Sequence, residues 1–188
     1  KVPDNLACLT LAAGVATLQA LERGGARQLG LKWPNDICAR GAKLGGILVD
    51  AQTGSGGNIS VICGIGVNVD LSLIDAERDG LTNLDYSVTD LKSHCNKLPQ
   101  RNVTAAAIID RVIRAIGIFE TTGLAPFRAD WNRYDCLSGK RVDINTPGDE
   151  FDGVADGIDA NGALRVITDH GPRRVYTGTV REMRAEHS

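Results

Sequence analysis

The sequence predicts an α/β (α+β) fold, in which a mixed sheet with helices is followed by a small β-barrel. Two long segments, at about residues 6–23 and 103–123, have the apolar spacing of helices. Apolar, β-branched runs typical of strands lie between them, and after Cys136 the chain becomes short alternating runs separated by turns. A chain of 188 residues, 43% of them hydrophobic, can form one core or a core with a small satellite domain.

The first predicted element is an almost wholly buried helix over residues 6–23. Its sequence, LACLTLAAGVATLQALER, follows an Asp-Asn capping signal and stops at Gly24-Gly25. A short strand over residues 28–33 and another over residues 43–51 come next, separated by a polar turn that contains Arg40-Gly41. This pattern predicts that the two strands pair as a hairpin.

The run ISVICGIGVNVD, which begins at Ile59, predicts a central strand because it is almost continuously apolar and β-branched. Residues 71–100 are expected to form a long irregular connection with one helical turn near Val88–Cys95, and such loops usually border a site. In the helix over residues 103–123, Thr104 is the expected cap. Five residues should share the buried face of this helix: Ile108, Ile109, Val112, Ile116 and Phe119.

The stretch LAPFRADWNRYD predicts a second, shorter helix, and the remaining residues predict a small barrel or sandwich of about five strands. The two parts should join near Asp135–Ser138. This division predicts one domain over residues 1–135 and another over residues 136–188.

Composition limits the classes of partner. The chain has 21 Lys and Arg against 23 Asp and Glu, so it lacks the basic field that attracts nucleic acid. Its five cysteines are scattered singly, which is typical of reduced intracellular thiols and predicts no metal ligands. The longest apolar stretch, residues 6–21, is too short to span a bilayer. We therefore expect a cytoplasmic protein that binds no membrane.

Three short motifs in the first part of the chain could carry chemistry. They are Trp33-Pro34-Asn35-Asp36, Lys43-Leu44-Gly45-Gly46 and Gly64-Ile65-Gly66-Val67-Asn68. Each has an ordinary explanation when taken alone, because Pro-Asn-Asp is a common turn and a single hairpin lysine is usually solvated.

The residues after Lys43 make it a candidate for binding an anion. Gly45 and Gly46 carry no side chains, so another group can approach the backbone there, and the strand then becomes fully apolar. An ammonium at that boundary can pair with a carboxylate or a phosphate. Such a contact is worth about 4 kcal/mol at about 4 Å and an effective dielectric constant of about 20, before desolvation is subtracted.

The Gly64-Ile65-Gly66 motif does not fit the dinucleotide-binding fingerprint, because a third glycine and a following helix are both missing. The amide of Asn68 can either read a base edge or only shape the end of the strand, and the sequence leaves both readings open.

Taken together, GLKWPNDI, KLGGILVD and GIGVNVD, in this order and at this spacing, resemble the central block of biotin protein ligases. The stretch Leu81-Thr82-Asn83-Leu84 is similar to a Thr-Ser-Leu segment of that family, with Asn in the serine place. FETTGLAPFRADWNRYD is similar to the helix before the family's terminal barrel. The resemblance covers about the whole chain.

This resemblance implies a catalytic core of the biotin/lipoate ligase type, followed by an SH3-like β-barrel. It also implies a two-step reaction. Biotin and ATP, with Mg2+, give biotinyl-5'-adenylate, and a lysine of a biotin carboxyl-carrier domain of a carboxylase then takes the biotin and releases AMP. Biotin, ATP and Mg2+ are thus the implied small molecules, and the carrier domain is the implied partner.

The resemblance also implies a role for each matched residue. Lys43 would neutralise the carboxylate and phosphate oxygens, and Asp36 would position the incoming carrier lysine and accept its proton. Asn35 is the polar neighbour of Asp36, near phosphate or metal. The remaining implied contacts are those of Gly45, Gly46 and Ile47 with the aliphatic tail of biotin, and that of Asn68 with adenine.

One departure from the family concerns the Gly-Arg-Gly-Arg loop, which is expected upstream of Lys1 and is absent from this sequence. The chain starts at Lys1 rather than at methionine, so we expect a cut N-terminus and an isolated chain that binds biotin weakly. Two alternatives stay open: a lipoate ligase-like enzyme, and a non-catalytic module that senses a ligand or docks on a carrier. An exposed sheet edge would also allow a homodimer.

Overall fold

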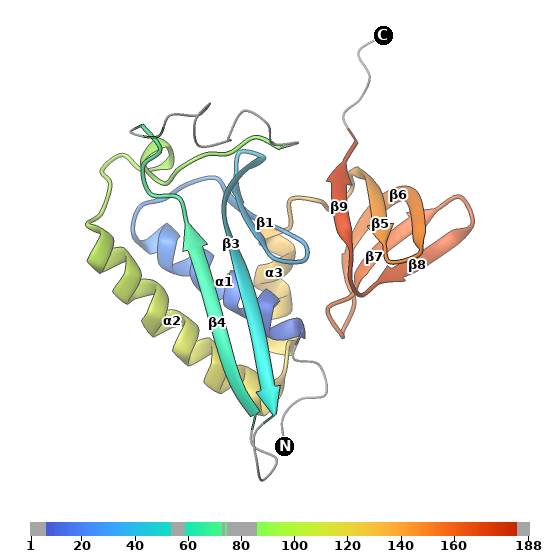
Figure 1. Ribbon diagram of the computed structural model, residues 1–188, viewed down its shortest axis with the longest axis horizontal. Coiled ribbons are helices and arrows are strands. Elements are labelled where there is room, and N and C mark those ends of the chain that lie inside the picture. Colours follow the sequence, from blue (N-terminus) through green and yellow to red (C-terminus); the bar gives the residue numbers. More distant parts are fainter. Residues whose placement is uncertain (1–6, 54–58, 73, 75–85, 184–188) are drawn as a thin grey trace.

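The structure is a computed structural model that describes residues 7–53, 59–72, 74 and 86–183. Helix α1 (Ala7–Arg23) and helix α2 (Arg101–Thr122) lie on one side of a four-stranded sheet, and a five-stranded sheet forms the C-terminal part (Figure 1). The α+β class predicted from the sequence is therefore confirmed. The Leu81–Leu84 stretch lies outside the described residues.

Helix α1 is the centre of the first part and is buried along almost its whole length. It ends as its glycines predict: Gly25 has a φ of 95°, and the amide of Ala26 donates to the carbonyl of Leu21 over 3.0 Å. This is the glycine-terminated helix end in which a left-handed residue lets the chain turn away.

The first sheet consists of β1 (Leu29–Lys32), β2 (Asp36–Ala39), β3 (Ala42–Thr53) and β4 (Ile59–Val67), in that order across the sheet. The predicted hairpin is wrong, because β2 lies between the two strands that were expected to pair. The chain reverses twice, first after Lys32 and again at Arg40-Gly41, whose φ angles are 49° and 78°. A strand of four residues is too short to show a clear period in the sequence.

The predicted central position of β4 is also wrong for the described strands, since β4 lies at the edge of its sheet. Its residues alternate between partly buried and exposed, and Ile62 is 60% exposed. Leu48 in the adjacent strand is 70% exposed. One face of this sheet is therefore packed on the helices while the other is open, although both faces have apolar residues.

Between β4 and α2, the predicted helical turn is present as a short 3-10 helix at Lys92–His94. Helix α2 begins at Arg101 rather than beside Thr104, whose hydroxyl lies inside the first turn and donates to the carbonyl of Gln100. Ile109 is 58% exposed, so its expected burial is wrong. The buried stripe of α2 consists of Ile108, Val112, Ala115 and Phe119, which recur every three or four residues.

A 3-10 turn at Ala125–Phe127 leads to the predicted short helix, α3 (Arg128–Tyr134). Five strands follow: β5 (Arg141–Thr146), β6 (Asp149–Ile158), β7 (Leu164–Thr168), β8 (Gly171–Val175) and β9 (Thr179–Glu182). They pair in the order β8-β7-β6-β5-β9. One cluster of buried apolar side chains runs from α1 into this second sheet, and the division at residue 135 remains a prediction.

None of the helices in the described ranges is long and apolar enough to cross a membrane.

Candidate active site

Lys43 and Asp36 form an ion pair in the first sheet. The Nζ atom of Lys43 lies 2.6 Å from Oδ1 of Asp36, and the two side chains are 31% and 24% exposed. The same ammonium lies 5.2 Å from the centre of the Tyr86 ring. The pair is thus partly shielded from water yet open to a ligand, which is where an ammonium binds an anion with useful strength.

The backbone around Lys43 is held on both sides. Its amide donates to the carbonyl of Ser87 over 2.8 Å, and its carbonyl accepts from the amide of Thr89 over 2.9 Å. Between β2 and β3 the register shifts at Ile37, so that Asp36 faces Gly46 while Cys38 faces Lys43. Irregularities of this kind redirect side chains, and here the two charged groups meet diagonally across the strands.

Gly45 and Gly46 differ in the space available for a side chain. A Cβ atom on Gly45 would lie 2.1 Å from the carbonyl oxygen of Gly66, so the contact between β3 and β4 requires glycine there without any ligand. A Cβ atom on Gly46 would have ordinary contacts of 3.8 Å with Asp36 Oδ1 and Lys43 Cε. Gly46 therefore borders the ion pair, whereas Gly45 is explained by the sheet itself.

Asn35 and Ile47 are joined by two hydrogen bonds. The Asn35 side-chain amide donates to the Ile47 carbonyl over 3.0 Å, and the Ile47 amide donates to the Asn35 carbonyl over 2.9 Å. The Ile47 side chain is buried in the core. Leu48 follows Ile47, and its side chain lies on the open face of the sheet. It was not among the predicted site residues, although the alternation of side chains along a strand indicates this position.

Asn68 follows β4 and is tied to the segment that also holds Lys43. Its backbone amide donates to Leu44, its side-chain amide donates to the carbonyl of Thr89 over 3.0 Å, and its carbonyl accepts from Leu91. The described bonds of Asn68 thus fit the reading in which it shapes the end of the strand. Asn68 and Lys43 nevertheless share one neighbour, Thr89, so the same short segment positions both.

Asp90 is a buried residue that sequence reasoning missed. It is 7% exposed and accepts hydrogen bonds from the amide of Leu71 and from the amide and hydroxyl of Ser93, over 2.6–2.9 Å. Burial alone would raise the pKa of its carboxyl, but these donors outweigh burial and hold the pKa below its usual value. An aspartate three residues before a serine at the start of a helical turn was the available signal.

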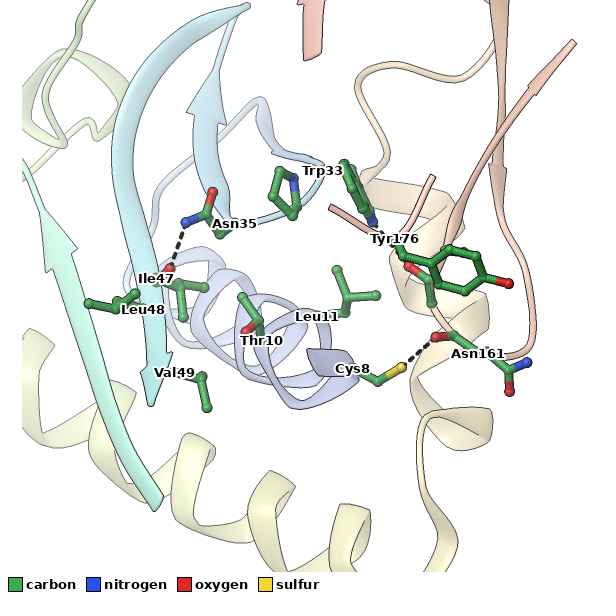
Figure 2. A pocket seen from close by; sticks show the side chains of 13 residues that line it. Cys8, Thr10, Leu11, Trp33, Asn35, Ile47, Leu48, Val49, Asn161 and Tyr176 are labelled. Atoms are coloured by element: carbon green, nitrogen blue, oxygen red, sulfur yellow. Dashed lines mark hydrogen bonds between the residues drawn. The ribbon is translucent and has the colours of Figure 1, made fainter. Parts of the chain in front are cut away.

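A pocket of about 340 Å³ is lined in part by residues of the candidate site (Figure 2). It is bounded by the Trp33-Pro34-Asn35 turn, by α1 and β3, and by the turn between β6 and β7. Its described lining includes Asn35, Ile47 and Leu48 from the candidate site, and Tyr176, which follows β8, but neither Lys43 nor Asp36. The pocket is mostly apolar and lies next to the ion pair rather than around it.

In the part of the chain that the structure describes, no three His, Cys, Asp or Glu side chains lie close enough together to bind a metal ion such as magnesium. The chemistry available from described residues is that of an ammonium and a carboxylate held together beside an exposed strand face.

Comparison of the sequence with known protein families and proteins identifies its relatives. Residues 2–68 match the Biotin/lipoate A/B protein ligase family, and residues 137–181 match the Biotin protein ligase C terminal domain. The Bifunctional ligase/repressor BirA of Escherichia coli K12 is 30% identical over 163 residues, covering 86% of this chain and 48% of that protein. The Biotin--[acetyl-CoA-carboxylase] ligase of Mycobacterium tuberculosis is 33% identical over 171 residues, covering 89% of this chain and 58% of the relative.

The chain thus spans about half the length of these curated relatives. Among solved structures, the biotin protein ligase from Aquifex aeolicus in complex with biotin and ATP superposes with a TM-score of 0.81 at 22% identity. That match covers 96% of this chain and 74% of the Aquifex chain, and it shows a shared fold. From its two matched domains and its relatives, the chain belongs to the biotin protein ligase family.

Proposed function

We propose that this protein is a biotin protein ligase, which forms biotinyl-5'-adenylate from biotin and ATP and transfers the biotin to a lysine of a carboxylase carrier domain. The observation that carries the proposal is the Lys43–Asp36 ion pair beside Gly46, in a chain whose relatives are biotin ligases. The match to a biotin protein ligase C-terminal domain favours biotin over lipoate.

In the first step, an ammonium is needed where two anions meet. The carboxylate of biotin attacks the α-phosphate of ATP and pyrophosphate leaves, so negative oxygens must approach one another. Lys43 would bind a carboxylate oxygen and an α-phosphate oxygen together, which reduces their repulsion and stabilises the charge that develops in the transition state. Because Gly46 has no side chain, the reacting carboxylate can come close to the strand beside Lys43.

In the second step, Asp36 would position the carrier lysine and accept a proton from its ammonium. The free amine then attacks the acyl carbon, the bond to the phosphate oxygen breaks, and AMP leaves. The Asp36 carboxylate lies 2.6 Å from the Lys43 ammonium, so an amine that attacks an acyl group bound at Lys43 would approach beside this carboxylate. Asn35 before β2, Ile47 within β3 and Asn68 after β4 would contribute further contacts to the ligands.

The test of Lys43 uses the full-length protein, with biotin, ATP, magnesium and the carrier domain of an acetyl-CoA carboxylase. Lys43→Ala should lower carrier biotinylation by about 100-fold or more, the usual cost of removing a group that stabilises transition-state charge. Lys97→Ala, which removes an exposed lysine from the connection before α2, should leave the rate unchanged. If Lys43→Ala keeps the wild-type rate, the proposed role is wrong and a non-catalytic module is favoured.

The two steps can be separated through Asp36. Asp36→Asn should still release pyrophosphate with biotin but should transfer biotin to the carrier slowly, because the amide accepts no proton at neutral pH. Pyrophosphate release with lipoate in place of biotin distinguishes the lipoate ligase alternative. Release with lipoate and none with biotin would overturn the proposed substrate.

A further inference from the structure

Cys38 and Cys136 come together where the first sheet meets the chain leading into the second. Cys38 in β2 lies opposite Gly30 of β1 in the strand register. The amide of Cys136 donates to the carbonyl of Leu31 over 3.0 Å, and a Cβ atom on Gly30 would lie 3.3 Å from Cβ of Cys136. Gly30 has no side chain, so Cys136 packs beside the position that pairs with Cys38 across the two strands.

The two thiols interact, and their pKa values shift in opposite directions. A hydrogen bond with Cys136, followed by burial, raises the pKa of Cys38, whereas the same hydrogen bond lowers the pKa of Cys136. Cys38 is buried and Cys136 is partly exposed, so Cys136 is both the better thiolate former and the more accessible sulfur.

The other three cysteines lack this arrangement. Burial raises the pKa of Cys8 to about 11, and it also raises the pKa of Cys63 and of Cys95. The Cys8 thiol donates to the carbonyl of Asn161 over 2.8 Å rather than to another sulfur. Cys136 is thus the thiol of the five whose pKa is lowered, and its neighbour is a second thiol.

We propose that Cys38 and Cys136 are a reversible dithiol site, which forms an intramolecular disulfide by exchange with a small disulfide of the oxidised-glutathione class. The thiolate of Cys136 attacks one sulfur of the small disulfide, whose S–S bond breaks, and one small thiol leaves. Cys38 loses its proton to solvent and attacks the sulfur of Cys136, and the second small thiol leaves. Two protein thiols are oxidised while one small disulfide is reduced to two thiols.

The disulfide would join β2 to the residues that follow α3. Asp36 begins β2, and Cys136 lies one residue after Asp135, which bridges to Leu31 of β1. The bond would therefore hold the start of the five-stranded part against the strand that carries Asp36. It uses neither Asp36 nor Lys43, so the proposal stands independently of the ligase reaction.

The experiment incubates the purified full-length protein with mixtures of oxidised and reduced glutathione, blocks free thiols by alkylation, and maps cysteines by mass spectrometry without reduction. At oxidising ratios we expect a linked pair of peptides that contain Cys38 and Cys136 and have lost two hydrogen atoms. Cys38→Ser should accumulate glutathione on Cys136, because the second thiol is gone. Cys95→Ser is the matched control, and its Cys38–Cys136 bond should form as in the wild type.

Full alkylation of both cysteines at the most oxidising ratio would overturn the proposal, as would pairing of Cys136 with a different cysteine. If Cys38→Ser does not fold, the alkylation rates of the cysteines in the wild-type protein test the proposal instead. Cys136 should then react before Cys8, Cys63 and Cys95, and an equal or slower rate for Cys136 contradicts the proposed site.

Discussion

The indole nitrogen of Trp33 donates a hydrogen bond of 3.0 Å to the carbonyl oxygen of Gly162. Trp33 precedes the turn that carries Asn35 and Asp36, and Gly162 lies in the turn between β6 and β7. Both residues are buried. The position of the candidate site is therefore tied to the second sheet through a contact that joins residues 129 positions apart.

Gly162→Ala should destabilise the protein strongly. Gly162 has a φ of 75°, and an added Cβ would lie 2.7 Å from Cys8 Sγ and 2.8 Å from Leu11 Cδ1. Overpacking together with left-handed strain should lower the free energy of unfolding by about 3 kcal/mol, measured by urea denaturation. Gly139→Ala is the control, because Gly139 has a φ of 78° and open space, and it should lose only about 1 kcal/mol. Equal losses in the two variants would contradict the packing argument.

Gly45→Ala and Gly46→Ala should separate the requirements of the sheet from those of the site. The Gly45 variant meets the Gly66 carbonyl, a backbone atom, so we expect a loss of about 3 kcal/mol or failure to fold. The Gly46 variant has only 3.8 Å contacts and should keep its unfolding free energy within about 1 kcal/mol. Circular dichroism during urea titration measures both. A Gly46 variant less stable than the Gly45 variant would reverse the assignment.

Tyr86→Leu should weaken the binding of biotin in the proposed reaction. Its ring faces the Lys43 ammonium at 5.2 Å, and such a contact at a partly exposed site is worth about 0.5–1 kcal/mol. We expect KM for biotin to rise about three-fold in a pyrophosphate-release assay, since a loss of 0.5–1 kcal/mol has that size. Tyr86→Phe keeps the ring and should behave as the wild type. A Phe variant as impaired as the Leu variant would assign the effect to the hydroxyl.

Asp90→Asn should destabilise the protein in a pH-dependent way. The folded pKa of Asp90 lies below its usual value, so its contribution is present above the unfolded pKa of about 3.9 and is lost as pH falls through the folded pKa. At neutral pH the variant should lose about 2 kcal/mol, because the three hydrogen bonds go to a charged acceptor. Urea midpoints between about pH 3 and pH 7 measure the difference, which should shrink toward acid.

The exposed Asp169 offers the control for this pH series. Asp169→Asn should change the unfolding free energy by less than about 0.5 kcal/mol across the range, as surface substitutions usually do. A constant difference between the wild type and Asp90→Asn at all pH values would show that the charge of Asp90 does not stabilise the fold.

Sequence reasoning worked best where one local signal decides the structure. The periodicity of α1 and α2 and the turns of the second sheet located those elements, because helix period and turn residues depend on neighbours along the chain. It was weaker for β2, a strand too short to show a period, and for β4, whose apolar run did not reveal which face is open. Ile109 was misplaced because one helical step moves a side chain off the buried stripe.

By itself, the sequence determined the class of fold, the family to which its motifs belong, and the residue types available for chemistry near Lys43. Only the tertiary structure decided which of them meet. The ion pair with Asp36 depends on a register shift between strands, Gly45 is required by the Gly66 carbonyl, and Cys136 reaches Cys38 across 98 positions of the chain. These contacts are set by strand pairing and packing between distant segments, which no local pattern encodes.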